Sequence, residues 1–177
     1  MGFDRAKILI MLTLAASPAL AFEPGWHPSP LAGEGDRASM GCPAAAEGVE
    51  QACIIVRCED DYSTGIHIQS GRWPGAEGNW HLTLDREDRT IAAIADAGPY
   101  SARLVDGDGW LLDGLLHGTF VYLRHAEDID GPYQQITLEG SFRAIGEALY
   151  WCAPRVPRGE QNAPPGVDPE SQQGEPQ

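Results

Sequence analysis

The chain has 177 residues, with 12 basic against 26 acidic side chains and a formal net charge of −14 at pH 7. A balance this negative repels nucleic acid and anionic lipid surfaces, so it excludes the binding classes that depend on basic patches. It suits a basic partner or simple solubility, and the length allows one folded domain of about a hundred residues with flanking segments.

Residues 1–21 have the pattern of a secretory signal peptide. Two basic residues precede the apolar run Ile8–Ala16, which is too short to span a bilayer, and Ala19-Leu20-Ala21 forms an A-x-A cleavage site. We expect cleavage before Phe22. No second apolar run approaches membrane-spanning length, and no cysteine follows the cleavage site closely. The sequence therefore predicts a soluble exported protein, periplasmic or secreted, without a membrane span.

Composition marks two further segments that flank the domain. Residues 22–52 are rich in Gly, Ala, Pro and Glu without an apolar period, so we expect a flexible N-terminal segment. Residues 153–177 hold six prolines and a polar Gln-Glu-Gly run, which is typical of a disordered tail. The β-rich domain is then expected to cover residues 53–152.

The run Cys53–Cys58 is the most β-prone stretch of the mature chain and carries a cysteine at each end. In an extended strand these two residues point to opposite faces and lie roughly 16 Å apart, so they cannot form a disulfide with each other. Two of the three possible pairings of four cysteines remain. We favour Cys58–Cys152, because Cys58 shares the apolar face of the strand, and Cys42–Cys53 on the other face. An even cysteine count in an exported chain predicts this kind of framework.

Downstream of this strand the apolar residues recur mainly at a period of two. Six further short strands are expected, at residues 64–69, 79–85, 89–95, 100–105, 119–124 and 133–139. Asp106-Gly107-Asp108-Gly109 predicts a turn, and Trp110–His117 predicts one or two helical turns that end at Gly118.

A closing helix is expected to follow the last strand. Ser141 can cap it, and Phe142, Ile145, Leu149 and Cys152 recur at helical spacing on its inner face. The fold class is therefore all-β, a small sandwich or barrel of about seven short antiparallel strands. It carries a short internal helix and a C-terminal helix, and disulfides staple it.

Motifs that carry chemistry are scarce. The chain has no G-x-S-x-G, no H-E-x-x-H, no P-loop and no dinucleotide fingerprint. Oxidised cysteines cannot serve as nucleophiles. The acidic stretches 106–109 and 127–131 resemble calcium loops but lack the ligand spacing of an EF-hand, so solvated turns are the simpler interpretation.

Five residues remain as site candidates. If the strands of His67 and His81 pair, both imidazoles lie on the outer face with Asp85, a set that can hold zinc or copper. Outward polar residues are what strand alternation demands in any case, so we predict no metal site and no cofactor. Tyr62 and Trp73, the latter in the loop between residues 70 and 78, are candidate ligand-binding aromatics, although they can equally plug the end of a barrel.

The stretch Ile136–Ile145, with an early strand that ends in cysteine, resembles small alphaproteobacterial periplasmic proteins of the invasion-associated locus B family. The resemblance covers about twenty residues and rests on a strand, a glycine and a helix with alanine and an aliphatic residue. It implies a non-enzymatic β-sandwich in the periplasm and supplies no catalytic residues.

The sequence as a whole favours a non-enzymatic, exported binding or structural domain. Its partner is expected to be a protein or an envelope component, and a basic one would suit the charge. The alternative is a periplasmic inhibitor of a basic hydrolase such as lysozyme, for which negative charge would steer the encounter. A third possibility is a hydrolase that uses polar loop residues.

Overall fold

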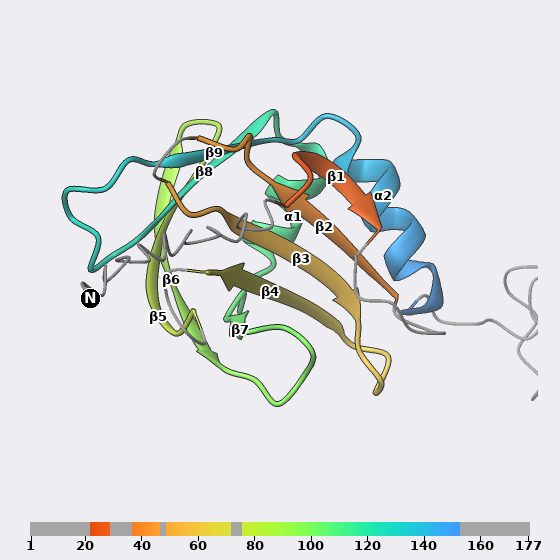
Figure 1. Cartoon of the computed structure of the whole chain (residues 1–177). Coiled ribbons are helices and arrows are strands. Elements are labelled where there is room, and N and C mark those ends of the chain that lie inside the picture. Colours follow the sequence, from red (N-terminus) through yellow and green to blue (C-terminus); the bar gives the residue numbers. More distant parts are fainter. Residues whose placement is uncertain (1–21, 29–36, 47–48, 72–75, 153–177) are drawn as a thin grey trace, which may run out of the picture.

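The computed structural model describes residues 22–28, 37–46, 49–71 and 76–152. The expected signal peptide, the expected tail and Trp73 lie outside these residues. The described chain forms one antiparallel sheet in the order β1-β2-β3-β4-β7-β6-β5-β8-β9, with two short helices (Figure 1). The strands are β1 Gly25–Pro28, β2 Ala38–Cys42, β3 Ala52–Cys58, β4 Thr64–Ser70, β5 Gly78–Leu84, β6 Glu87–Ala95, β7 Ala102–Leu104, β8 Phe120–His125 and β9 Gln134–Thr137.

The sheet curls strongly, so that β8 and β9 return toward β1 and β2 (Figure 1). Two side-chain hydrogen bonds connect β9 to the first strands of the sheet. The indole Nε1 of Trp26 in β1 donates to the carbonyl of Thr137 in β9 at 3.0 Å, and the backbone N–H of Ala52 donates to the Gln134 side chain at 2.8 Å. The all-β class is thus confirmed, as a single curled sheet rather than two separate layers.

All seven expected strands are present, and two more come from the segment that we expected to be flexible. β2 reads Ala-Ser-Met-Gly-Cys and is buried at all five positions, because it lies between β1 and β3 and is covered on both faces. Small residues without apolar alternation gave no strand signal. The expected boundary at residue 53 was therefore wrong, and the sheet begins at Gly25.

The inner face of the sheet holds the main core. Ile54 and Val56 of β3 pack there with the inward residues of the other strands, as alternation predicts. Helix α1 (Trp110–His117) contributes Leu111 and Leu115, and helix α2 (Ser141–Leu149) contributes Ile145. A second, smaller cluster on the opposite face contains Met40, Ile55, Tyr100 and the Cys42–Cys53 pair.

Both disulfides connect the cysteines that the strand geometry favoured. Cys42 bonds Cys53, and Cys58 bonds Cys152 in a 3₁₀ turn, Tyr150–Cys152, that follows α2. The first joins β2 to β3 on the second face, and the second joins the end of β3 to the end of α2.

The turn before α1 uses its acidic residues to organise the helix. The Asp106 carboxylate accepts hydrogen bonds from the backbone N–H groups of Leu111 and Leu112, both at 3.0 Å. These donors have no partner within the helix, so the Asp106 side chain satisfies its N-terminus, while Gly109 occupies the N-cap position. Asp108 accepts the backbone N–H of Trp110 at 3.3 Å and a hydrogen bond from Arg89 of β6 at 2.6 Å, and the contact with Arg89 is the main cause that holds the pKa of Asp108 below its ordinary value.

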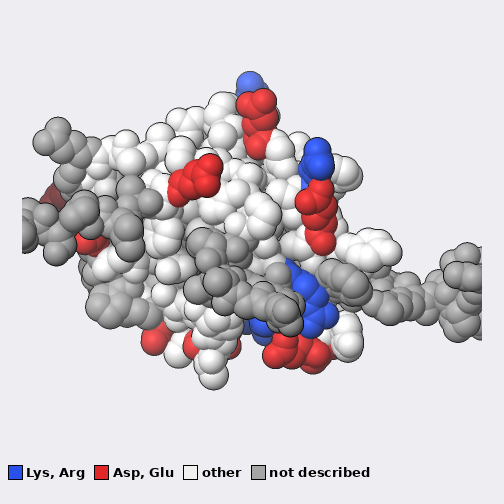
Figure 2. Space-filling view, turned by 45° about the vertical axis from the view of Figure 1, so that its right-hand side comes forward, with Lys and Arg blue, Asp and Glu red and all other residues white. Residues whose placement is uncertain are grey.

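Helix α2 differs from the expectation in two details. Its N-cap is Gly140, in the left-handed region at φ 82°, and the Ser141 hydroxyl donates to the Leu138 carbonyl instead of capping the helix. Phe142 is 64% exposed and does not face the core, whereas Ile145 and Ala148 are buried. Figure 2, in which the α2 side of the molecule comes forward, shows a surface where most described residues are uncharged.

Candidate functional site

His67 is fully buried, contrary to the expectation that it points to solvent. It lies on the second face of the sheet, beside Ile55 of the neighbouring strand, and its ring centroid is 5.5 Å from that of Tyr100. The period of two correctly separated the faces of β4, but it could not reveal that the segment around Tyr100 covers the second face.

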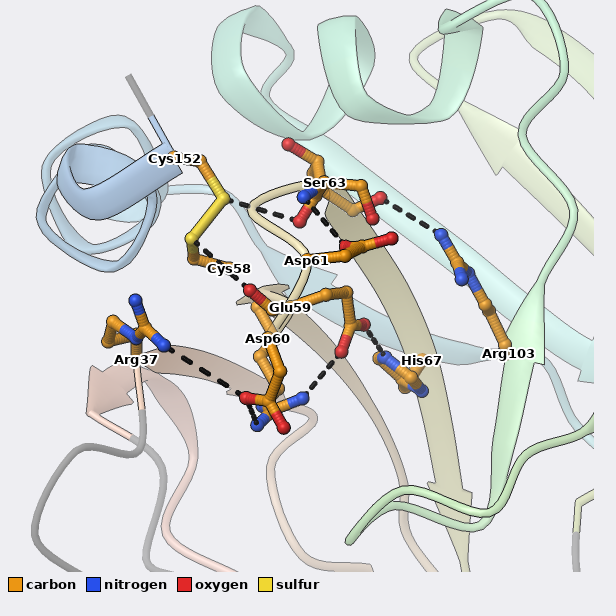
Figure 3. The surroundings of a disulfide bond; sticks show 11 residues. Arg37, Cys58, Glu59, Asp60, Asp61, Ser63, His67, Arg103 and Cys152 are labelled. Atoms are coloured by element: carbon orange, nitrogen blue, oxygen red, sulfur yellow. Dashed lines mark hydrogen bonds and ion pairs between the residues drawn. A yellow bond between two sulfur atoms is a disulfide. The ribbon is translucent and has the colours of Figure 1, made fainter. Parts of the chain in front are cut away.

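Two carboxylates flank the His67 ring. Its Nε2 is 2.6 Å from Oε1 of Glu59, and its Nδ1 is 3.3 Å from Oδ2 of Asp96. Figure 3 shows Glu59 reaching His67 beside the Cys58–Cys152 disulfide. Gly65 makes room for this pair, because a Cβ there would lie 1.7 Å from the Glu59 carboxylate. Nε2 is hydrogen-bonded to Glu59, whereas the buried Nδ1 approaches Asp96 without a hydrogen bond. We interpret His67 as a structural link between β3, β4 and the β6–β7 loop.

The three candidate metal ligands are not brought together. β4 and β5 are separated in the sheet by β7 and β6, so His67 and His81 do not lie on paired strands. His81 contacts the Thr90 hydroxyl through Nδ1 at 3.0 Å, and Asp85 accepts the backbone N–H of Thr119 at 3.0 Å. The described residues contain no group of three or more His, Cys, Asp or Glu that could hold a metal ion. The expectation that the protein binds none stays a prediction.

Tyr62 lies in the β3–β4 turn with its side chain 63% exposed. The Arg37 guanidinium carbon is 5.6 Å from its ring centroid. Arg37 lies directly before β2. The ring of Tyr62, in the β3–β4 turn, is therefore close to a basic side chain from the start of another strand.

A groove that the sequence did not reveal lies next to Arg37. It has a volume of about 460 Å³ and runs between β1, the start of β2 and α2. Its uncharged lining includes Trp26, Pro28, Ala38, Gly140, Ala144 and Ala148. Its other lining residues are His27, Arg37, Arg143 and Glu147.

The position of Trp26 is set by its neighbours in β2 and β9. Gly41 is its partner in the ladder, and a Cβ on Gly41 would lie 2.5 Å from the indole ring. The absence of that Cβ lets the ring pack flat against β2, while its Nε1 is held by Thr137. One wall of the groove is therefore a rigid aromatic side chain rather than a mobile loop.

A second exposed feature is the β8–β9 loop, which projects from one end of the sheet (Figure 1). Ile129 near its tip is 75% exposed and lies between Asp128 and Asp130. Arg124 braces the loop, because its Nη1 donates to the carbonyls of Ile129 at 3.0 Å and Gly131 at 3.4 Å.

Buried His125 anchors the base of the same loop. Its Nδ1 accepts the backbone N–H of Glu127 at 3.3 Å, so its Nε2 carries the proton and donates to the carbonyl of Glu77 at 2.9 Å. Both nitrogens of this imidazole are therefore also used by the fold.

A scan against models of known protein families and searches of curated proteins and of solved structures found no match to this chain. The resemblance of residues 136–145 to the invasion-associated locus B family stays a prediction. None of the helices in the described parts of the chain is long and apolar enough to cross a membrane.

Proposed function

We propose that this chain is an exported, soluble binding domain without catalytic activity, and that it binds its ligand in the groove between α2 and β1. The observation that carries the proposal is the groove itself. Its volume of about 460 Å³ falls within the range of small-molecule sites, which is about 300–1,000 Å³.

The rigidity of the groove supports a binding role. Trp26 is fixed by its ladder partner and by a hydrogen bond, and α2 is tied to the end of β3 by the Cys58–Cys152 disulfide. Walls that are already ordered lose little conformational entropy when a ligand binds.

The proposal of a non-enzymatic role is supported by the two buried histidines of the described chain. The ring nitrogens of His67 face two carboxylates, and those of His125 bond the backbone. A general base needs a ring nitrogen within reach of a substrate proton. These two rings do not line the groove, and the ring nitrogens of His27, which does, lie 2.9 Å from the Pro28 carbonyl and 3.1 Å from the Glu23 carbonyl. The signal-peptide pattern of residues 1–21 supports export to the periplasm or beyond.

The groove can be tested by filling it. Ala144 lines the groove, whereas Gly146 lies on the exposed side of the same helix with open space around its Cα. We compare wild type, Ala144→Trp and Gly146→Trp after incubation with envelope extract, and identify retained small molecules by native mass spectrometry. We expect retention by wild type and Gly146→Trp and loss in Ala144→Trp. Equal retention by all three, or retention by none, would refute the proposal.

Inhibition of a basic hydrolase is the second candidate function, and the braced β8–β9 loop favours it. A loop held in one conformation, with an exposed apolar residue flanked by carboxylates, suits insertion into a cationic cleft. We expect salt-sensitive inhibition of a lysozyme that is weakened in Ile129→Ala. Ile94→Ala is the matched control, because Ile94 is another exposed isoleucine, in β6. Inhibition that is equal in both variants would count against the loop.

A further inference from the structure

We infer that the groove between α2 and β1 binds a small molecule that combines an apolar body with a carboxylate group. This inference rests on the proposed function of the groove and adds the chemical class of its ligand. It is carried by the sign and the placement of the charges in the lining.

The lining is cationic in an otherwise acidic protein. The whole chain carries 26 acidic against 12 basic residues, yet the described lining contains Arg37 and Arg143 against Glu147 alone. Local positive charge in the groove of a molecule with a net charge of −14 favours an anionic ligand there over a cationic one.

Both arginines can exchange their present partners for a ligand. The Arg143 Nε is 2.9 Å from Oε1 of Glu147, in an exposed pair one helical turn apart, and exposed pairs of this kind are weak. Arg37 approaches Asp60 only to 4.0 Å (Figure 3), and Asp60 already pairs with Arg57 at 3.2 Å. Each arginine therefore binds a carboxylate of the protein weakly, and a ligand carboxylate has the same chemistry.

The N-terminus of α2 lies at the groove. Gly140 borders the groove, and the first turn of the helix contains no acidic residue. The positive end of the helix dipole therefore adds to the field of the two arginines, and the exposed carboxylate of Glu139, directly before Gly140, acts against it.

The apolar part of the lining selects the body of the ligand. Trp26, Pro28, Ala38, Ala144 and Ala148 offer an aromatic ring and small aliphatic groups. Burying an aliphatic or aromatic group against them is favourable in proportion to the apolar area removed from water. A purely inorganic anion would not contact the apolar lining. We therefore infer that the ligand is an organic carboxylate.

The test uses two probes that differ only in charge. N-acetyl-L-leucine carries a carboxylate, and N-acetyl-L-leucinamide is its neutral analogue of nearly identical shape. We titrate each, and inorganic phosphate as a third probe, into the full mature protein and follow the backbone amides of Ala38, Gly140 and Ala144 by NMR. We expect saturable shifts with N-acetyl-L-leucine, about tenfold weaker binding of the amide, and weakening as salt rises.

Arginine variants connect this preference to the groove. Arg37→Gln and Arg143→Gln should each weaken carboxylate binding about fivefold. Arg86→Gln makes the same change of charge on the exposed turn between β5 and β6 and should leave the affinity unchanged apart from small long-range effects.

Three results would overturn the inference. Equal affinities for N-acetyl-L-leucine and N-acetyl-L-leucinamide would show that the groove does not recognise the carboxylate charge. Phosphate binding as tight as that of N-acetyl-L-leucine would show that the apolar body of the ligand contributes nothing. An equal effect of Arg86→Gln would place the attraction outside the groove. The Ala144→Trp experiment does not depend on ligand charge, so failure of the groove as a binding site is distinguishable from failure of the carboxylate assignment.

Discussion

Removing the Cys58–Cys152 disulfide should destabilise the protein more than removing Cys42–Cys53, because the two bonds close loops of very different size. The chain-entropy relation gives about 4.7 kcal/mol for a separation of 94 residues and about 2.8 kcal/mol for a separation of 11. Domains of this kind are stable by about 5–15 kcal/mol, so the first loss is a large part of the total.

The comparison is informative because the loss of buried contacts alone would make removal of Cys42–Cys53 the more destabilising change. Cys42 and Cys53 are both buried, whereas Cys152 is only partly so. Double replacement by alanine therefore removes at least as much buried sulfur from the short loop as from the long one. If removing Cys58–Cys152 lowers the free energy of unfolding more, the cause is then the greater conformational entropy of the unfolded chain rather than the loss of contacts in the folded one.

The assay is equilibrium unfolding in urea under oxidising conditions, with each variant keeping its other disulfide. We expect the free energy of unfolding to fall by about 2 kcal/mol more in Cys58→Ala/Cys152→Ala than in Cys42→Ala/Cys53→Ala. If the free energy of unfolding falls as much or more in Cys42→Ala/Cys53→Ala, the Cys58–Cys152 bond does not stabilise the protein through loop entropy.

The other predictions concern single side chains. Gly41→Ala should cost about 1–3 kcal/mol in urea unfolding because its Cβ meets the indole ring at 2.5 Å, whereas Gly146→Ala, at an open helical position, should gain about 0.5–1 kcal/mol. His67→Leu should cost about 2–4 kcal/mol, since it leaves two carboxylates without the buried ring between them, and a loss under 1 kcal/mol would show that the ring is not a structural link. Arg89→Gln should raise the pKa of Asp108 toward its ordinary value in an NMR titration. Because the folded-state pKa values of Asp108 and Glu87 are lowered, the stability from their pairs with Arg89 should be present at neutral pH and be lost as pH falls below about 4. A difference between wild type and Arg89→Gln that is as large at pH 2 as at pH 7 would contradict this.

Local sequence signals were sufficient for most of the β-structure. Apolar residues at every second position in β4 and β5 face the same core because side chains alternate along a strand, whatever the neighbours are. The same geometry excluded a bond between Cys53 and Cys58 and led to the pairing that the structure contains. These inferences needed distances along one strand only.

Features that depend on contact with segments distant in the sequence could not be predicted from the sequence. β2 contains Ser, Met, Gly and small residues, and it is a strand because β1 and β3 pair with both of its edges. His67 follows the alternation of β4 correctly, yet it is buried because a segment about thirty residues later crosses that face. Alternation specifies which side a residue takes, and tertiary contacts decide whether that side meets water.

The groove belongs wholly to the tertiary structure. Trp26, Arg37 and Arg143 come from β1, the approach to β2 and α2, and more than a hundred residues separate the first from the last. Each is an ordinary residue in its own segment, without a motif around it. They share one lining because the sheet curls until β9 meets Trp26 and α2 packs beside β1, and this closure depends on the sum of many long-range contacts rather than on any local pattern.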